Sequence, residues 1–470
     1  RVEDGHCFDF GVLEMDAAAS LVLSKRCLAQ LPEVLRMAAT RYSRLYVTVH
    51  PELSLQKTLD SVYAEASAHS PHLDVRVLLK NALPHGVKPL RSEDGSIPSS
   101  LPSINPPYRR VCLGGTFDQL HNGHKVLLSR AAMVASEAIV CGVTDGDMNI
   151  KKTLWELIEP VENRMKAVEE FVKDVTDISC ELYPITDPFG PSITINDLQA
   201  IVVSEETLRG GEAVNKKRAE LNMSSLVIEK ILLIEGNDKI LNETKLSSSS
   251  RRKEALGTLR KPINTKPRFK PYTIGITGGI ASGKTKVADD LRGLGYQVLD
   301  CDKIAHGTYS PGSPLVIKID KTFPGVVNDK GEVDRKALGN IIFNNPEKRL
   351  QLNSIVWPAV LDAVNAELDK AYEKSPSSVV FIEAAAIVEA GWHNELHETW
   401  TIFCAKNEEL KRIMNRDSLT KQQAEARMSS QISNRERLNV SHVAICSDWE
   451  RSITQEQVKK AVKLLEERRK

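Results

Sequence analysis

Short apolar runs alternate along most of the chain with longer stretches in which apolar residues recur every three or four positions. The short runs predict buried β-strands, and the three-to-four period predicts amphipathic α-helices. Strands that alternate with helices usually pair in parallel, because the crossover helix returns the chain to the same end of the sheet. The pattern therefore predicts an α/β protein with helix-covered parallel sheets.

The alternation is strongest in two parts of the chain, which we expect to form two doubly wound parallel-sheet domains. In the first part we expect strands at 111–113, 138–143, 198–203 and 230–234, and a helix at 123–135. In the second part we expect strands at 273–277, 297–299, 379–382, 400–404 and 442–445, and an amphipathic helix from about Thr454.

Residues 1–105 show a weaker alternation. We expect helices at 31–44 and 61–70 and strands at 45–49 and 75–79, which make a small N-terminal α/β region without visible chemistry. The chain begins with Arg1 rather than Met, so we expect it to be a fragment of a longer product.

Two segments of different composition separate these regions. Residues 91–107 hold four prolines among serines, which favours an extended connector. Residues 241–271 contain four consecutive serines and three following cations, which favours a solvated linker that is partly helical. The expected division is an N-terminal region at 1–105, a first domain at 106–240, a linker at 241–271 and a second domain at 272–470.

Composition excludes two classes of protein. Hydrophobic residues make up 41% of the 470 residues, and no apolar run approaches the roughly 18 residues of a membrane span. The net charge of +1 offers no general attraction for nucleic acid or for an anionic membrane. The eight cysteines are scattered without zinc-like spacing, which favours free thiols in a reducing compartment.

A glycine-rich loop follows the expected strand 273–277. Residues 278–285 read GGIASGKT and fit the phosphate-loop pattern GxxxxGK[ST] between a strand and a helix. Backbone N–H groups of such a loop bind phosphate, Lys284 would reach the β- and γ-phosphates, and Thr285 would hold Mg²⁺. The expected nucleotide contacts are Gly278, Gly279, Ser282, Gly283, Lys284 and Thr285.

Two carboxylates and two arginines are further candidates. Asp300 and Asp302 follow an expected strand, at the sheet edge where ligands bind, and one of them would act as a base toward an acceptor hydroxyl or help to bind Mg²⁺. Capping of a helix is the alternative role for this pair. Arg416 and Arg427 would neutralise charge on a transferring phosphoryl group, with a solvated helix as the alternative.

Most of residues 272–465 resembles the dephospho-coenzyme A kinases, small phosphate-loop enzymes that phosphorylate a ribose 3′-hydroxyl. The resemblance rests on 276–284, 300–302, 334–338 with Phe343, 383–389 and 416–431. It implies catalytic roles for Lys284, Asp302 and Arg427, nucleotide binding by Arg416, and Mg²⁺ binding by Thr285 and Asp302. Trp357-Pro358 stands where the family commonly has His-Pro, so Trp357 is given no role.

A histidine motif opens the expected helix of the first domain. Residues 114–124 read GGTFDQLHNGH, directly after the strand 111–113. His121 and His124 at a helix N-terminus, with Thr116 nearby, form a site for nucleotide phosphates. An acceptor phosphate would attack the α-phosphorus of ATP and pyrophosphate would leave, so the protein positions reactants and stabilises charge. Metal binding by the two histidines is the alternative, but no third ligand has zinc-like spacing.

This motif resembles the HxGH nucleotidyltransferase superfamily, and residues 108–235 resemble its phosphopantetheine adenylyltransferase branch, particularly the form fused to a kinase. The branch is indicated by VVSEET at 202–207 and NKKR at 215–218. The resemblance implies catalytic roles for His121, His124 and Thr116. The expected ATP contacts are Gly114, Gly115, Phe117, Gly123, Ser204, Lys151 or Lys152, and Arg164 or Arg218, with plain surface charge as the alternative for these cations. Class I aminoacyl-tRNA synthetases share HxGH, but the chain has no KMSKS-like loop.

The two motifs together indicate consecutive reactions, and the pair resembles the animal family of bifunctional coenzyme A synthases. The resemblance implies adenylyl transfer from ATP to 4′-phosphopantetheine, then phosphorylation of the dephospho-coenzyme A formed. It implies ATP and Mg²⁺ as cofactors, no nucleic-acid partner, and a cytosolic location with mitochondrial association. The alternatives are another HxGH transferase fused to a nucleoside kinase, and a scaffold that only senses ATP.

Overall fold

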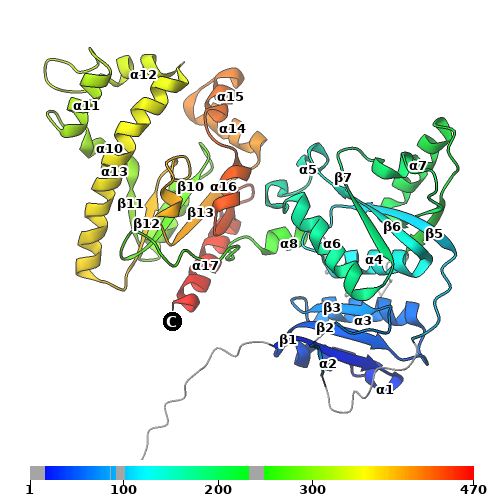
Figure 1. Ribbon diagram of the computed structural model, residues 1–470. Coiled ribbons are helices and arrows are strands. Elements are labelled where there is room, and N and C mark those ends of the chain that lie inside the picture. Colours follow the sequence, from blue (N-terminus) through cyan, green and yellow to red (C-terminus); the bar gives the residue numbers. More distant parts are fainter. Residues whose placement is uncertain (1–15, 85, 91–100, 232–247, 344, 470) are drawn as a thin grey trace, which may run out of the picture. The chain divides into compact units, whose positions relative to one another are not determined.

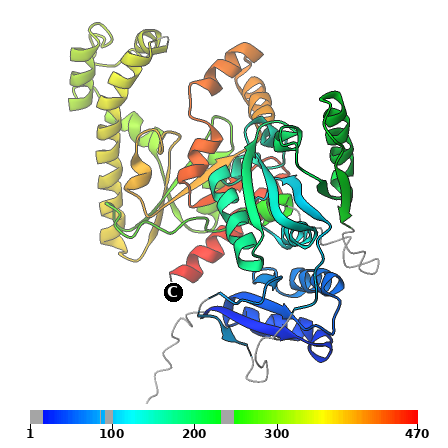
Figure 2. The ribbon, with the colours of Figure 1, turned by 45° about the vertical axis from the view of Figure 1, so that its right-hand side comes forward.

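The structure, a computed structural model, describes residues 16–84, 86–90, 101–231, 248–343 and 345–469. The chain forms two compact units, Arg1–Arg251 and Arg252–Lys470. Every strand pairing within their sheets is parallel, and helices cover the sheets (Figure 1 and Figure 2). The predicted fold class, helix-covered parallel sheets, is confirmed.

The N-terminal region is a four-stranded sheet with the order β3-β2-β1-β4. Its strands are β1 (Asp16–Leu23), β2 (Tyr42–Val49), β3 (Asp74–Leu78) and β4 (Lys88–Pro89), and its helices are α1 (Lys25–Leu28), α2 (Leu31–Ala39) and α3 (Leu55–His69). The helix expected at 31–44 ends five residues early, because the chain turns at Thr40 and then enters β2. Strand β1 was missed, because three of its eight residues are alanines, which favour helix over strand.

The first unit also contains a five-stranded sheet with the order β7-β6-β5-β8-β9. Its strands are β5 (Tyr108–Gly115), β6 (Ala135–Thr144), β7 (Ser179–Ile185), β8 (Ala200–Ser204) and β9 (Val227–Ile231). The helices are α4 (Asn122–Val134), α5 (Asp147–Ile150), α6 (Val161–Val175) and α7 (Leu208–Glu220), and α8 (Ser248–Glu254) begins in this unit and ends in the second. The strand order reverses direction between β5 and β8, and ligands bind outside the carboxyl ends of strands at such a point. Residues 232–234 of the expected last strand lie outside the described residues.

The two sheets of this unit share a core. Leu59 of α3, Leu128 of α4 and Phe171 of α6 are fully buried in one continuous hydrophobic cluster. Helices α4 and α6 lie between the two sheets (Figure 1). The N-terminal region is therefore packed onto the helix that begins with the histidine motif.

The second unit has a five-stranded sheet with the order β11-β12-β10-β13-β14. Its strands are β10 (Tyr272–Gly278), β11 (Gln297–Asp300), β12 (Val379–Glu383), β13 (Glu398–Phe403) and β14 (Val443–Cys446). Its helices are α9 (Lys284–Gly293), α10 (Cys301–Thr308), α11 (Pro314–Thr322), α12 (Arg335–Phe343), α13 (Pro346–Lys374), α14 (Lys406–Asp417), α15 (Lys421–Ser429), α16 (Asn434–Val440) and α17 (Arg451–Arg468). Strand β10 is central, so the loop that follows it opens at the middle of the sheet edge. Trp357 lies within α13 and packs against the core.

The segment expected as a solvated linker is packed where the structure describes it. Residues 248–254 form α8, and the side chain of Arg252 is buried. Leu256 and Phe269 are buried as well, and Leu259 forms an antiparallel bridge to Val443. The polar composition of the serine and cation run gave no sign that these apolar residues would be buried and would anchor the segment. Residues 241–247 lie outside the described part of the chain.

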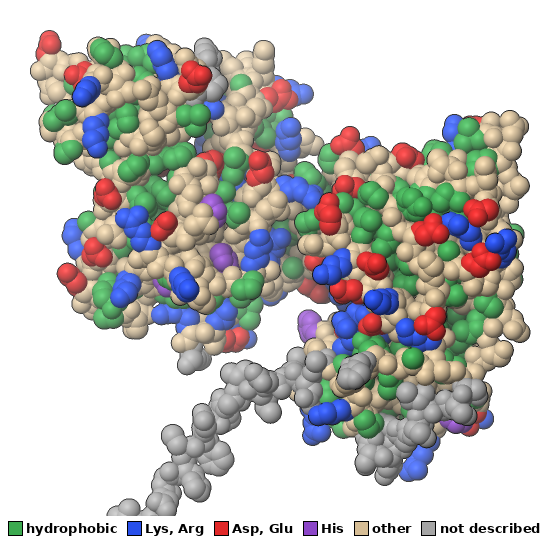
Figure 3. Space-filling view, viewed as in Figure 1, with side chains coloured by type: hydrophobic (Ala, Val, Ile, Leu, Met, Phe, Trp, Pro, Cys, Tyr) green, Lys and Arg blue, Asp and Glu red, His purple; other side chains and the backbone are tan. Residues whose placement is uncertain are grey.

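Surface features match the composition. Within the described residues, no helix has the length and apolar character needed to cross a membrane. On the face shown in Figure 3, Lys and Arg side chains are interspersed with Asp and Glu, as the net charge of +1 predicts. The cysteines of the described residues are free thiols: Cys27, Cys112, Cys141, Cys180, Cys301, Cys404 and Cys446.

Candidate active sites

The loop between β5 and α4 has a constrained backbone. Phe117 and Gln119 have φ angles of 50° and 49°, in the left-handed region that costs a residue with a Cβ roughly 1–2 kcal/mol. Burial and hydrogen bonding stabilise this shape: Phe117 is fully buried, and the buried Asp118 carboxylate accepts a hydrogen bond of 3.1 Å from the Glu159 N–H. The chain therefore reaches His121 in a fixed direction.

The glycines of this site allow close approach of the aromatic rings. A Cβ on Gly123 would lie 3.2 Å from the His121 ring, and one on Gly115 would lie 3.0 Å from the Phe117 ring. A Cβ on Gly114 would make only an ordinary contact of 3.7 Å with a backbone oxygen. The packing of these rings therefore depends on the absence of a side chain at Gly115 and Gly123.

His121 and His124 are brought together at the start of α4. Their rings are stacked with centroids 3.7 Å apart, and the His121 N–H donates to His124 Nδ1 at 3.4 Å. Because Nδ1 accepts this bond, we assign the hydrogen of the neutral His124 ring to Nε2, where it can donate to a phosphate oxygen.

The electrostatic environment keeps His124 neutral. Burial lowers the pKa of His124 well below its usual value, and the positive charges of Arg251 and Lys152 and the neighbouring His121 add to this effect. A neutral imidazole at a helix N-terminus acts as a hydrogen-bond donor rather than as a cation.

Thr116 is held by Lys152 and not by its neighbour Lys151. Lys152 Nζ donates a short hydrogen bond to Thr116 Oγ1, and it also donates to Thr144 Oγ1 at 3.0 Å and to Asn149 Oδ1 at 2.9 Å. Lys151 is exposed. Of the two lysines that the sequence left open, the structure brings Lys152 to the loop.

The structure does not leave the N–H donors of Arg218 available for a phosphate at the histidine site. Its buried guanidinium donates to the carbonyl oxygens of Ser224 and Ser192, both at 2.6 Å, so it stabilises the fold around α7. Arg164 is also buried and donates to the carbonyl oxygens of Thr116 at 2.7 Å and of Thr144 at 2.8 Å, so it supports the loop from behind. Ser204 lies at the carboxyl end of β8, at the same sheet edge as the loop.

Helix α8 supplies residues that the sequence analysis missed. Ser248 Oγ lies 3.3 Å from His121 Nε2, and Arg251 donates to the Gln119 carbonyl oxygen at 3.3 Å. A serine run followed by cations was the available signal, but this composition is also typical of a linker. The histidine site therefore includes a segment more than a hundred residues away in sequence.

The phosphate loop of the second unit is tightly enclosed by its neighbours. Gly278 and Gly283 have φ angles of 157° and 96°. A Cβ on Gly278 would lie 2.0 Å from the Ile402 carbonyl oxygen, and one on Gly279 would lie 2.4 Å from Glu409 Oε1. A larger residue at Gly278 would push the loop away from the β13 backbone, whereas one at Gly279 would displace the Glu409 side chain.

Lys284 folds over this loop, where its ammonium donates to the Gly278 and Gly279 carbonyl oxygens at 2.9 and 2.8 Å. Burial lowers the pKa of Lys284 to about 8, and the positive charge of Arg437 adds to the effect, while Glu383 and Asp302 oppose it. Lys284 is thus only partly protonated just above neutral pH.

This lowered pKa predicts how ATP binding depends on pH. A triphosphate favours the charged form, so it binds most tightly below the free-enzyme pKa of about 8. Above that pKa, binding requires proton uptake, and the KM for ATP should rise up to about tenfold per pH unit. Initial rates at a fixed acceptor concentration measure this, with Lys284→Arg, whose side chain does not titrate, as the control. A KM that is equally flat in both proteins would contradict the prediction.

Several side-chain oxygen atoms lie beside the loop. Thr285 Oγ1 donates to Glu383 Oε1 at 2.8 Å, while Glu383 Oε2 is buried and has no hydrogen-bond partner among the described residues. Asp302 is exposed, and its negative charge acts on Lys284. Asp300 instead caps α10 by accepting from the Lys303 N–H at 3.1 Å. Hydroxyl and carboxylate oxygens suit Mg²⁺, so this group of side chains fits the expected ion. No cluster of three or more His, Cys, Asp or Glu with metal-binding geometry occurs in the described ranges.

Arg416 and Arg427 meet at one carboxylate. Arg416 makes two hydrogen bonds to Asp417, at 2.8 and 3.0 Å, and Arg427 Nη1 donates to Asp417 Oδ2 at 2.7 Å. Both arginine side chains are about half exposed. The structure thus brings the two predicted phosphate ligands together, each paired with the same acid.

We expect Asp417 to compete with phosphate for these arginines. In Asp417→Asn both arginines are released, so the KM for ATP should fall about threefold, within the modest range of surface ion pairs. Glu425→Gln, which removes an exposed acid paired with Lys421 on the same helical hairpin, is the control. A rise in KM for Asp417→Asn would mean that the acid orients the arginines instead.

Two further residues beside the loop were given no role from the sequence. Gln431 Oε1 accepts from the Ile280 N–H at 2.9 Å, and Arg437 is buried, donating to Glu389 Oε1 at 2.9 Å. Arg437 also acts electrostatically on Lys284.

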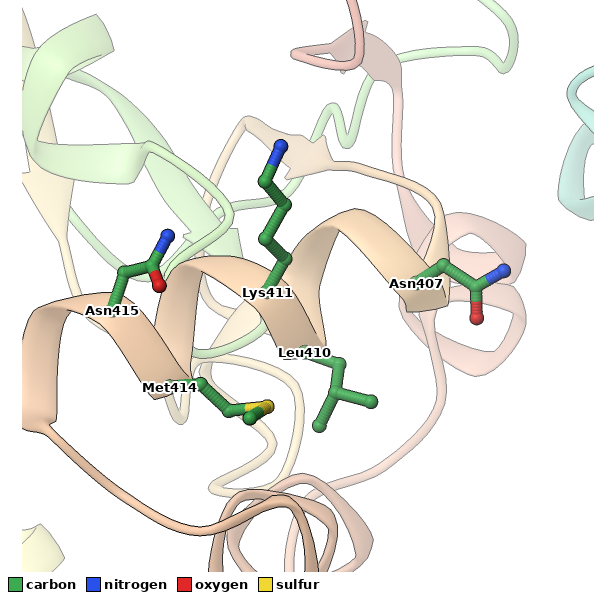
Figure 4. A pocket seen from close by; sticks show the side chains of 5 residues that line it. All are labelled: Asn407, Leu410, Lys411, Met414 and Asn415. Atoms are coloured by element: carbon green, nitrogen blue, oxygen red, sulfur yellow. The ribbon is translucent and has the colours of Figure 1, made fainter.

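A hollow of about 220 Å³ on the same unit lies away from the phosphate loop, on α14 (Figure 4). It is lined by Asn407, Leu410, Lys411, Met414 and Asn415 and contains no phosphate-loop residue.

The fold and the loop give the second unit the architecture of a phosphate-loop nucleotide-binding domain, and the histidine motif at a β–α junction gives the first unit that of a nucleotidyltransferase. A family model described as dephospho-CoA kinase matches residues 272–451, and one described as cytidylyltransferase-like matches residues 112–255. A dephospho-CoA kinase from Carboxydothermus hydrogenoformans is 34% identical over 186 residues, which are 39% of this chain and 90% of that protein. The chain belongs to the dephospho-CoA kinase family.

The chain is also similar to an adenylyltransferase and to a kinase of known structure. A phosphopantetheine adenylyltransferase from Saccharomyces cerevisiae is 39% identical over 144 residues, which are 30% of this chain and 47% of the yeast protein. The chain thus spans about half the length of that relative. The solved dephospho-CoA kinase from Campylobacter jejuni is 25% identical, with 42% of this chain and 98% of that chain covered and a TM-score of 0.34.

Proposed function

We propose that this chain catalyses two consecutive steps of coenzyme A synthesis. The first unit transfers the adenylyl group of ATP to 4′-phosphopantetheine and releases pyrophosphate. The second unit transfers the γ-phosphoryl group of ATP to the ribose 3′-hydroxyl of the dephospho-coenzyme A formed. One observation carries the proposal: a single chain has a histidine motif and a phosphate loop, each at a β–α junction, and the relatives of its two parts are named for reactions in which one product is the next substrate.

In the first reaction, an oxygen of the phosphopantetheine phosphate attacks the α-phosphorus of ATP. The bond to the β-phosphate breaks, and its electron pair leaves with pyrophosphate. His124 and His121 donate hydrogen bonds to the phosphate oxygens, and Lys152 with Thr116 neutralises charge on the acceptor side. Ser248 and Arg251 of α8 border the same site.

In the second reaction, the 3′-hydroxyl oxygen attacks the γ-phosphorus and ADP leaves. The hydroxyl proton goes to Asp302, because Asp300 is engaged in capping α10. Lys284 and the loop amides hold the β- and γ-phosphates, and Arg416 and Arg427 turn from Asp417 to the transferring group.

Mg²⁺ is part of the proposal for the kinase site. Thr285 would hold it, with Glu383 and Asp302 supplying carboxylate oxygens nearby. When bound, the ion would neutralise charge on the β- and γ-phosphates. The hydroxyl and the buried carboxylate are present for this role whether or not the ion is bound.

The alternative function, another HxGH transferase fused to a nucleoside kinase, uses the same phosphate chemistry. Purified chain incubated with ATP and either 4′-phosphopantetheine or nicotinamide mononucleotide distinguishes the two by pyrophosphate release. The proposal expects release with phosphopantetheine only. Release with nicotinamide mononucleotide alone would favour the alternative.

The proposal assigns the first activity to residues 106–240 together with α8, and the second to 272–470. It also includes the cytosolic location with mitochondrial association that the family resemblance implies. Fractionation of cells that express the natural protein, with an antibody against this chain, tests the location. Recovery in the nuclear fraction alone would contradict it.

A further inference from the structure

The first turn of α4, which carries both histidines of the motif, is held by side chains and backbone of the N-terminal region. Lys125 Nζ donates to Asp74 Oδ1 at 2.6 Å and to the Val75 carbonyl oxygen at 3.0 Å, both on β3. Asn122 Nδ2 donates to Ser67 Oγ of α3 at 3.0 Å. These contacts involve the residues directly after His121 and directly after His124.

The positive charge of Lys125 would be unfavourable at this position without an acidic partner. It lies in the first turn of a helix, where the helix dipole disfavours a positive charge, and only 4% of its surface is exposed. Burial lowers the pKa of Lys125, and the Asp74 carboxylate opposes this effect. A buried cation at a helix N-terminus therefore depends on its partner in the N-terminal sheet.

Asp74 connects four elements, since Arg44 of β2 donates to its Oδ2 at 2.7 Å in addition to the contacts with β3, α4 and α6. Its Oδ2 accepts from Arg76 of β3 at 2.9 Å, and Arg76 also pairs with Asp174 of α6 at 2.6 Å. Burial would raise the pKa of Asp74, but Lys125 and Arg76 hold it well below its usual value. The carboxylate is therefore always charged near neutral pH, and it links β3 to α4 and, through Arg76, to α6.

A second contact joins the N-terminal region to the loop before the histidines. Arg251 of α8 donates both to the Gln119 carbonyl oxygen and to the Pro71 carbonyl oxygen, the latter at 3.4 Å. A cleft of about 170 Å³ lies between these elements, with Asp74, Lys125 and Arg251 in its lining. The N-terminal region thus contacts the histidine site from two directions.

We propose that Asp74 is a positioning residue for adenylyl transfer: through Lys125 it fixes the first turn of α4 and so the orientation of His121 and His124 toward the phosphates. This inference rests on the proposed function of the first unit, and it gives the N-terminal region a role in that reaction. A shift of about 1 Å in a catalytic group costs on the order of 10²-fold in rate, so small movements of this turn matter.

The chain offers a matched control for this role. Asp60 of α3 forms an ion pair with Arg130, which lies on the same helix α4 but six residues beyond His124. This pair also joins the N-terminal region to α4, and both partners are largely buried. Asp60→Asn and Asp74→Asn therefore each remove an acid that pairs with a cation of α4, one far from the histidines and one beside them, although Asp74 also pairs with Arg76 and Arg44.

The experiment measures kcat and KM for adenylyl transfer in the full chain. Kinase activity with supplied dephospho-CoA reports the concentration of intact chain, and the thermal unfolding curve reports whether the first unit is folded, because the kinase site belongs to the other unit. In Asp74→Asn the kcat should fall about tenfold or more, since the histidines are displaced, while KM values stay within about twofold. Asp74→Glu should recover part of this loss. Ser67→Ala, a milder change that frees Asn122, should lower kcat a few-fold, and Asp60→Asn should leave kcat unchanged while it lowers the melting temperature.

The outcomes separate this inference from the proposed function. If the unmodified chain makes no dephospho-CoA, the proposed function fails and the inference with it. If the unmodified chain is active and Asp74→Asn keeps its kcat, the inference alone is wrong. Equal losses of kcat in Asp74→Asn and Asp60→Asn would show general support of the fold and would also overturn it.

Discussion

A Lys284→Ala variant is expected to convert 4′-phosphopantetheine to dephospho-CoA at the unmodified rate and to stop there. Lys284 is the only phosphate-loop side chain with a positive charge, and its ammonium sits over the loop that holds the phosphates. Removal of one preorganised charge of this kind costs on the order of 10²–10³ in kcat. The measurement is the ratio of dephospho-CoA to coenzyme A after incubation with phosphopantetheine and ATP.

The control for this variant is Lys286→Ala, since Lys286 lies two residues further along the same helix α9 and outside the phosphate-loop motif. It should make coenzyme A normally. Loss of both activities in a folded Lys284→Ala protein would show that the two sites are not independent.

The second large effect is expected at the histidines. His124→Ala removes the Nε2 donor of a neutral, half-buried ring, and His121→Ala removes its stacked neighbour. If each acts as a donor to the transition state, each loss should cost about 2.7–4 kcal/mol, or roughly 10²–10³ in kcat for adenylyl transfer. Pyrophosphate release from ATP and phosphopantetheine measures this directly.

Kinase activity with supplied dephospho-CoA should stay unchanged in both histidine variants, because the phosphate loop belongs to the other unit. His69→Ala, a change of a partly exposed histidine on α3, serves as the control within the same unit. Normal pyrophosphate release by His124→Ala would refute the role assigned to the motif.

Parts of the two sites could be predicted because their signals are local. The loop at 278–285 and the motif at 114–124 each need a strand, a turn and a helix in direct succession, and short-range patterns determine all three. The alternation of strands and helices likewise predicted the parallel sheets. The central placement of β5 and β10 then follows from the way such sheets are wound.

The remainder depends on contacts between distant residues. Lys151 and Lys152 are neighbours, and only the tertiary turn after α5 decides which one reaches Thr116. Arg218 was expected at a phosphate, but the carbonyl oxygens that take up its donors lie on segments that the sequence gives no reason to bring together. Ser248 and Arg251 were assigned to a linker, since a serine and cation run has the same composition whether it is solvated or packed.

The N-terminal region shows the same limit. The sequence predicted a small α/β region there, but Asp74 and Lys125 have no local pattern that marks them as partners. Lys125 was noticeable only as a cation in the first turn of a helix, which is unfavourable by itself. Only the tertiary structure reveals its partner, because β3 packs against α4.

We propose that two anion sites on one chain act in succession on one metabolite. The decisive experiment is mass spectrometry of the products formed over time from 4′-phosphopantetheine, ATP and Mg²⁺. We expect dephospho-CoA to appear first and then to decline as coenzyme A accumulates. Unaltered phosphopantetheine after prolonged incubation with folded protein, or an adenylylated product that is never phosphorylated, would contradict it.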